Sequence, residues 1–158
     1  MKLLKFENGS FIEAEGFAAH GVAGLTISFE EWRDNGYLNS ANALVIPNHQ
    51  DLGDLDADFS AFETIILEFP TFKDGRAYSQ ARRLRDQYGF RGDIAACGDI
   101  ARDQVLFMLR AGVNVFEVPS DLSRAFEDAS REFSLFYQHA ADRVEPVWRL
   151  RRERAIAA

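Results

Sequence analysis

Apolar residues fall into four short runs from residue 43 onward, and each run has the length of a β-strand. The runs cover residues 43–46, 64–69, 93–97 and 113–118. Three of them stop at a proline, at positions 47, 70 and 119, and proline cannot continue a central strand. Because the runs are almost continuously apolar, we expect strands that are covered on both faces.

Helical spacing separates these strands. Ala77, Ala81, Leu84 and Tyr88 lie on one face of a helix that we expect to end at Gly89. A second helix is predicted by the same spacing at Ala101, Val105, Met108 and Gly112. Ser120 is predicted to cap a third helix, whose apolar face would be formed by Leu122, Phe126, Ala129, Phe133, Phe136 and Tyr137.

The two ends of the chain differ from this pattern. Leu3–Phe6 and Ser10–Glu13 flank Asn8-Gly9, which predicts a β-hairpin with a two-residue turn. Ser28 and Glu31 have the spacing of a capping box, followed by a short helix from Phe29 that stops at Asn35-Gly36. Beyond Pro146 the pattern fades into a basic end, which favours a solvated or frayed helix over a partner-binding tail.

Strands that alternate with helices predict an α/β fold with a parallel sheet. We expect about four β–α units in one domain over residues 1–158: an N-terminal hairpin and short helix in 1–40, the core in 41–140 and a basic C-terminal helix or tail in 141–158. The pattern does not separate a half-barrel from an open doubly wound sheet. Two half-barrels could close against each other, which predicts a homodimer.

Composition excludes several classes of protein. The 158 residues are 47% hydrophobic and 27% charged, as in an ordinary globular domain. No apolar run reaches the roughly 18–20 residues of a membrane span, and the N-terminus turns polar too early for a secretory signal, so we expect a cytoplasmic protein without membrane contact. The formal net charge of −7 argues against nucleic-acid binding. The single cysteine, Cys97, is predicted to be a small buried side chain rather than a redox thiol.

Positive charge is concentrated in one part of this acidic chain. Residues 70–110 hold eight Lys or Arg and five Asp or Glu, whereas residues 1–69 hold three and twelve. The carboxyl ends of parallel strands meet at one edge of a sheet, where ligands bind. We therefore predict an anion site at this edge, with the candidates Lys73, Asp74, Gly75, Arg76, Tyr78, Ser79, Asp99 and Arg102.

Each candidate also has a structural alternative. Arg76 could bind an oxyanion or could pair with Asp74 or Asp99 to hold the loop. Asp99 is expected first to be a helix N-cap, and Arg102 is expected to be a surface or packing residue. Of Arg82, Arg83 and Arg85, at most two can face the site, because successive helical positions differ by about 100°.

Motifs for metals and cofactors are missing from the sequence. The acidic run at Asp54, Asp56 and Asp58 lacks the glycine and the final glutamate of a calcium loop. The three histidines are scattered, so no metal site is predicted. No glycine-rich dinucleotide or phosphate loop is present, and the cofactor, if there is one, stays unknown.

Residues 69–118 contain a dense set of short motifs: Phe69-Pro70, Phe72, Asp74-Gly75-Arg76, Tyr78-Ser79, Ala81-Arg82, Leu84-Arg85, Gly98-Asp99 and Arg102-Asp103-Gln104. These motifs resemble the core of an uncharacterised bacterial family, a domain of unknown function, and the similarity covers about residues 40–140. Members of that family carry the label of an oxidoreductase involved in sulfite reduction. The resemblance implies a link to assimilatory sulfur metabolism but implies no mechanism.

Together these observations lead to two functional expectations. The first is a protein of sulfite reduction that binds a small oxyanion or a nucleotide at the carboxyl edge of the sheet. The alternative is a non-catalytic accessory subunit that docks on sulfite reductase, with an acidic N-terminal third and a basic C-terminal end as complementary surfaces. A third reading, acid–base catalysis by Asp74 or Asp99 with Lys73, ranks last. Whether the chain turns over a substrate is left open.

Overall fold

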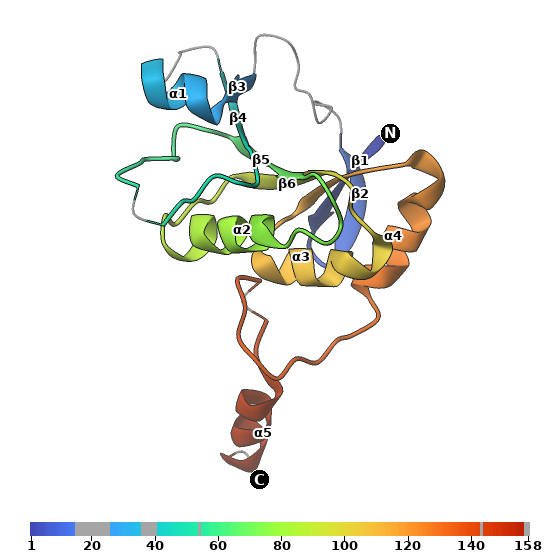
Figure 1. The fold of residues 1–158 in the computed structure, drawn as a ribbon. Helices are drawn as coiled ribbons and strands as arrows, with labels where there is room; N and C mark the ends of the chain where they lie inside the picture. Colours follow the sequence, from blue (N-terminus) through green and yellow to red (C-terminus); the bar gives the residue numbers. More distant parts are fainter. Residues whose placement is uncertain (15–25, 36–40, 54, 143, 157–158) are drawn as a thin grey trace.

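A computed structural model describes residues 1–14, 26–35, 41–53, 55–142 and 144–156. The described strands form one seven-stranded sheet in the order β2-β1-β7-β6-β5-β4-β3 (Figure 1). Their bounds are β1 Lys2–Glu7, β2 Ser10–Ala14, β3 Thr26–Ser28, β4 Ala43–Ile46, β5 Thr64–Phe69, β6 Asp93–Gly98 and β7 Val115–Val118.

Five α-helices accompany the described strands. They are α1 Phe29–Asn35, α2 Arg76–Asp86, α3 Val105–Ala111, α4 Ser123–Ser130 and α5 Val147–Ile156. Single 3-10 turns at Arg102–Gln104 and Ser120–Leu122 lead into α3 and α4. Helices α2, α3 and α4 lie on one side of the sheet, and α5 projects away from the body (Figure 1).

The strand order decides between the two predicted sheets. Strands β3 to β7 are parallel and neighbour one another in chain order, without the reversal of a doubly wound sheet. This is the half-barrel-like alternative. The hairpin lies antiparallel beside β7, with Leu4 opposite Phe116, and therefore occupies the edge that β7 would otherwise leave open.

Most predicted elements are confirmed within a residue or two. β4 and β5 have the predicted bounds, and the hairpin turns at Asn8 and Gly9 with φ of 52° and 82°. The capping box is present, because the Ser28 hydroxyl accepts from the Glu31 amide at 3.2 Å and the Glu31 carboxylate accepts from the Ser28 amide at 3.1 Å. The predicted stop of α1 at Gly36 lies outside the described residues.

Both faces of the central strands are buried, as their continuous apolar character predicts. On the helix side the core holds Leu44, Ile65, Leu67, Phe69, Ile94, Ala96 and Phe116. The other face carries a smaller cluster of Ala43, Ile66, Ala95, Cys97 and Val115. Burial raises the pKa of the Cys97 thiol to about 12, so this side chain is the buried small residue that the sequence predicts.

Three predictions about helices are wrong. α4 ends at Ser130, and its predicted continuation is irregular, with Phe133 and Tyr137 exposed by 62% and 75%. Ser120 lies in the 3-10 turn, and its hydroxyl accepts no capping hydrogen bond from the described backbone. Asp99 caps no helix, because Ala101 precedes the 3-10 turn and the Asp99 carboxylate accepts instead from the amide of Phe72.

Arg110 holds the irregular segment after α4 against α3. Its guanidinium pairs with Asp142 at 2.9 Å, donates to the carbonyl of Gln138 at 2.7 Å and lies 3.8 Å from the ring centroid of Phe136. The amide of Ala141 in turn donates to the Arg110 carbonyl. Contacts of the Arg110 guanidinium therefore fix the course of this segment, which is irregular rather than helical.

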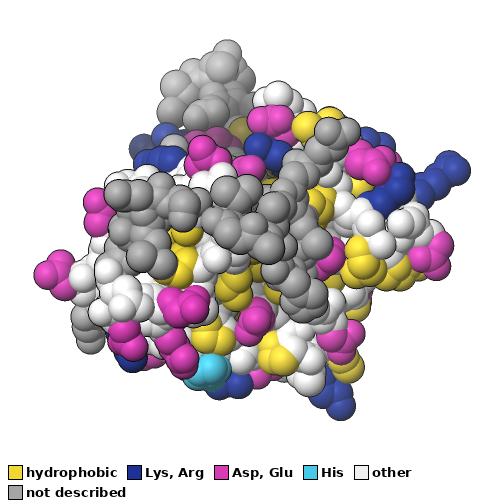
Figure 2. All heavy atoms as spheres, turned by 90° about the horizontal axis from the view of Figure 1, so that it is seen from above, with side chains coloured by type: hydrophobic (Ala, Val, Ile, Leu, Met, Phe, Trp, Pro, Cys, Tyr) yellow, Lys and Arg dark blue, Asp and Glu magenta, His cyan; other side chains and the backbone are white. Residues whose placement is uncertain are grey.

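Acidic side chains are spread over the side of the molecule away from α2 and α3, and the dark blue cations lie mostly toward its margins (Figure 2). This arrangement agrees with the acidic surplus of residues 1–69. No helix in the described ranges combines the length and the apolar character that crossing a membrane requires.

Gly98 ends β6 with φ of 104°, and a Cβ atom there would lie well inside van der Waals contact of the Phe69 carbonyl. We predict that Gly98→Ala lowers the free energy of unfolding by on the order of 3 kcal/mol, from backbone strain and this clash together. Gly89→Ala is the matched control, because Gly89 also has positive φ but no neighbour within 4 Å. Urea unfolding of both variants checks this, and equal losses would contradict the clash.

Candidate functional site

A pocket of about 280 Å³ lies at the carboxyl edge of the parallel strands. One wall is the segment that leaves β4, from Asn48 to Leu52, and the other is the first two turns of α2. The helix contributes Arg76, Ser79, Gln80 and Arg83. The predicted edge thus holds a pocket, and two of the predicted site residues, Arg76 and Ser79, line it.

The four helix residues share one face because their spacing is i, i+3, i+4 and i+7. A second row of the same helix, formed by Ala77, Ala81 and Leu84, is fully buried against the sheet. α2 therefore turns its apolar row to the core and the adjacent polar row to the segment after β4. No glycine or special backbone geometry is needed to create this wall.

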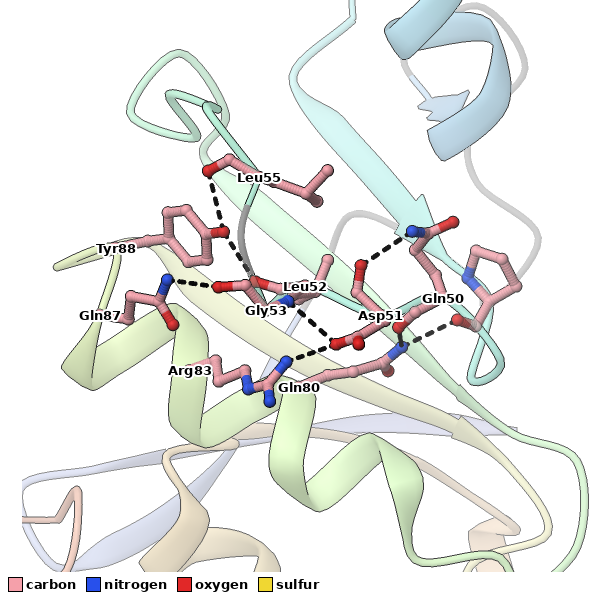
Figure 3. Close-up of polar contacts among 10 residues, drawn as sticks. Gln50, Asp51, Leu52, Gly53, Leu55, Gln80, Arg83, Gln87 and Tyr88 are labelled. Carbon is pink, nitrogen blue, oxygen red and sulfur yellow. Dashed lines mark hydrogen bonds and ion pairs between the residues drawn. The ribbon is translucent and has the colours of Figure 1, made fainter.

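Polar contacts fix the segment after β4 to this row, and Figure 3 shows them. The Gln80 amide group donates to the carbonyls of Pro47 at 2.9 Å and of Gln50 at 2.8 Å. Gln87 donates to the Gly53 carbonyl at 2.7 Å, and the Tyr88 hydroxyl lies 2.7 Å from the Leu52 carbonyl. An irregular segment is thus held in place by side chains that satisfy its backbone.

Both arginines of the pocket are paired with aspartates. Arg76 bonds to Asp74 through Nε at 3.0 Å and Nη2 at 2.6 Å, and Arg83 bonds to Asp51 through Nη1. The pairing alternative for Arg76 is therefore present. Since each guanidinium carries five N–H donors, Nη1 of Arg76 and Nη2 of Arg83 remain without a partner in the part of the chain that is described.

The Arg76 guanidinium holds the pKa of Asp74 well below its ordinary value, and the Asn48 side chain adds to this lowering. A carboxyl with a lowered folded-state pKa stabilises the fold above its ordinary titration range, and this contribution is lost as the pH falls. At neutral pH the loop therefore keeps its ion pair. The buried Gln80 Oε1 has no hydrogen-bond partner in the described residues.

The other predicted residues lie near the pocket without lining it. Gly75 is the residue before α2, and Lys73 is exposed, 5.6 Å from the ring centroid of Phe72. Tyr78 turns to the core and packs edge-on against Phe69, and burial, helped by the charge of Asp103, raises its pKa to about 12.

Asp99 and Arg102 have structural partners. The Asp99 carboxylate accepts from the Phe72 amide at 3.1 Å and so ties the loop after β5 to the loop after β6. Gln104 reinforces this link, because its amide donates to the Phe72 carbonyl at 2.7 Å. Arg102 points elsewhere and pairs with Glu132 after α4. The loop after β5 is thus held by its neighbours.

Sequence reasoning missed the residues after β4. For the arginines of α2 it predicted how many can face the site but not which ones. Asn48, His49, Gln50 and Asp51 line the pocket, yet they show no motif. Of the three helix arginines, Arg83 faces the pocket, whereas Arg82 pairs with Asp86 and Arg85 is directed to the other end of the sheet. The i, i+3, i+4, i+7 row from Arg76 to Arg83 is the signal that would have found the wall.

The pocket offers hydrogen-bond donors, and an aspartate balances the charge of each of its two arginines. Unused guanidinium N–H groups, the Ser79 hydroxyl and the imidazole of His49 are groups that bind the oxygens of a small anion. Within the described ranges, no three His, Cys, Asp or Glu side chains gather as a bound metal ion requires. The geometry therefore suits the binding of an anion.

A family model described as bacterial protein of unknown function (DUF934) matches residues 43–148. This match covers more than half of the chain, so the chain belongs to that family. It includes the segment after β4, all of α2 and the irregular segment after α4. No curated protein and no solved structure matches the chain.

Gln80 connects α2 to the segment after β4, and we predict that Gln80→Leu lowers the free energy of unfolding by about 2 kcal/mol. The Pro47 carbonyl still accepts from the Gln50 amide, but the Gln50 carbonyl loses its side-chain donor. Ser79→Ala is the control on the same face and is expected to be neutral. Chemical denaturation measures both, and an unchanged midpoint for Gln80→Leu would show that the contact carries no stability.

Proposed function

We propose that this family member binds a small oxyanion, free or as the anionic group of a nucleotide, in the pocket between the segment after β4 and α2. The observation that carries the proposal is the pair Arg76 and Arg83, which line one pocket from the same helix face. Each keeps N–H groups that its aspartate does not use. An anion can therefore bind without breaking either ion pair.

The resemblance to a family labelled for sulfite reduction supports a particular kind of anion. Sulfite, sulfate and adenylylated sulfate each carry an oxyanion that two guanidinium groups can bind in the bidentate manner. We propose on this basis that the chain serves sulfite reduction by holding such a species. The proposal is limited to binding and includes no chemical step.

Titration calorimetry and thermal unfolding with sulfite, sulfate, phosphate and adenylylated sulfate test this proposal. We expect at least one of them to bind and to raise the melting temperature. Arg76→Ala and Arg83→Ala should each weaken binding by about tenfold or more, because each removes a charge-assisted hydrogen bond. Arg82→Ala is the matched control, since Arg82 lies on the same helix, pairs with Asp86 and does not line this pocket. No stabilisation by any of these anions would refute the proposal.

A second candidate function is that of an accessory subunit on sulfite reductase. The observation that favours it is the row of exposed apolar side chains after α4, among them Phe133, Leu135, Tyr137 and Trp148. Exposed aromatic residues of this kind are typical of protein interfaces. Trp148 lies in α5, and the exposed Arg151 and Arg152 of the same helix would meet an acidic surface.

Binding of the full chain to purified sulfite reductase tests this second candidate. We expect association at low ionic strength that weakens by about tenfold or more in high salt, because exposed charges are screened. Arg151→Glu and Arg152→Glu should each weaken it further, whereas Arg124→Glu on α4 serves as the charge-matched control. Biolayer interferometry measures all three, and a chain that ignores the reductase would exclude this function.

A further inference from the structure

A second and larger pocket lies at the opposite edge of the sheet, where the parallel strands begin. Its volume is about 720 Å³, within the range of about 300–1,000 Å³ found for sites of small organic ligands. The walls come from α3, the end of α2 and the turn after it, the β1–β2 hairpin and the irregular segment after α4. It shares no lining residue with the pocket of the proposed function.

The interior of this pocket has little to offer a polar ligand. The Arg85 guanidinium donates to the carbonyls of Phe90, Gly92 and Gly112 at 2.8 to 3.0 Å, and to the side-chain oxygen of Asn114 at 3.2 Å. These polar groups are therefore already satisfied by one another. The remaining walls include the apolar side chains Leu106, Leu109, Val113, Phe133 and Phe136.

The charged groups of the pocket leave an excess of positive charge. Its one acid in the described chain, Asp142, is paired with Arg110 at 2.9 Å. Arg91 and Arg131 are exposed and line the pocket, and their side chains have no partner within the described residues. Burial lowers the pKa of Arg85, the nearby carboxylate of Asp93 opposes this lowering, and the charge of Arg91 adds to it. Arg91 therefore lies close to a like charge that Asp93 offsets only in part.

We propose that this pocket binds an amphipathic organic anion, with an apolar chain or ring system between α3 and the segment after α4 and its anionic group at Arg91 and Arg131. Apolar walls beside the Arg91 and Arg131 side chains match both parts of such a molecule. A segment of another protein could also cover an apolar surface. The concave shape, enclosed by elements from separate parts of the chain, favours a small ligand.

The ligand itself is unidentified, so the test uses two defined probes. Anilinonaphthalene sulfonate is an aromatic anion whose fluorescence rises in apolar sites, and decanoate is a simple chain with one carboxylate. We expect one molecule of the dye to bind per chain and decanoate to displace it. Decanol, which has the same chain without the charge, should displace it at least about tenfold more weakly, because it cannot pair with the arginines.

Variants separate the contributions of charge and cavity. Arg91→Gln/Arg131→Gln should weaken decanoate by about tenfold or more and leave decanol unchanged. Ser134→Trp places a large side chain at an exposed position of the lining and should reduce both. Arg124→Gln, outside the pocket, is the control. Circular dichroism shows whether each variant folds like the wild type.

Two results would overturn the proposal. One is the absence of dye and decanoate binding by the folded wild-type chain, which is also the result expected if the pocket receives only a segment of another protein. The other is binding that neither the double arginine variant nor Ser134→Trp changes, because the probe would then occupy a different surface. Neither result bears on oxyanion binding at the carboxyl edge, since the two pockets share no lining residue.

Discussion

The structure depends on one helix, α2, which packs on the sheet with one row of side chains and forms hydrogen bonds to the segment after β4 with the adjacent row. One row of α2, including Ala77, Ala81 and Leu84, is fully buried on the sheet. The adjacent row donates hydrogen bonds to the segment after β4, which has no regular structure of its own between Pro47 and Gly53. Because the two rows are about 100° apart, the fit of the first to the core fixes the position of the second. The candidate site is therefore a consequence of core packing.

The fold followed from the sequence where hydrophobic pattern and proline agreed. β4 and β5 were predicted to the residue, because each is a continuous apolar run that stops at a proline. β3 was missed, since a strand of three residues, Thr26–Ser28, is too short to show a period. The choice between a half-barrel and a doubly wound sheet depends on strand order, and no local pattern contains that information.

The segment after α4 shows why helical spacing alone misled. Phe133, Phe136 and Tyr137 continue the helical spacing that begins with Phe126 and Ala129. Only Phe126 and Ala129 are buried in the core. Beyond Ser130 a helix would gain no burial, whereas Arg110 offers a cation to Asp142 and a planar face to Phe136. Tertiary contacts of this segment thus override the helical preference that its spacing indicates. The predicted site residue Asp99 is a similar case, because its carboxylate accepts from the Phe72 amide in a neighbouring loop rather than from a helix N-terminus.

The positive charge of residues 70–110 illustrates the limit of composition as a guide to a site. A helix of 11 residues rises by about 16 Å, so α2 extends from the carboxyl edge of the sheet to the opposite edge. Arg76 and Arg83 line a pocket at the first edge, Arg85 is directed to the second, and Arg82 pairs in solvent with Asp86. Charges that are neighbours in sequence are thus divided between two pockets of different character and the surface. Arg85, which is partly buried, binds backbone carbonyls and so supports the fold rather than a ligand. Helical phase, rather than the local excess of cations, decides which of these side chains can meet an anion.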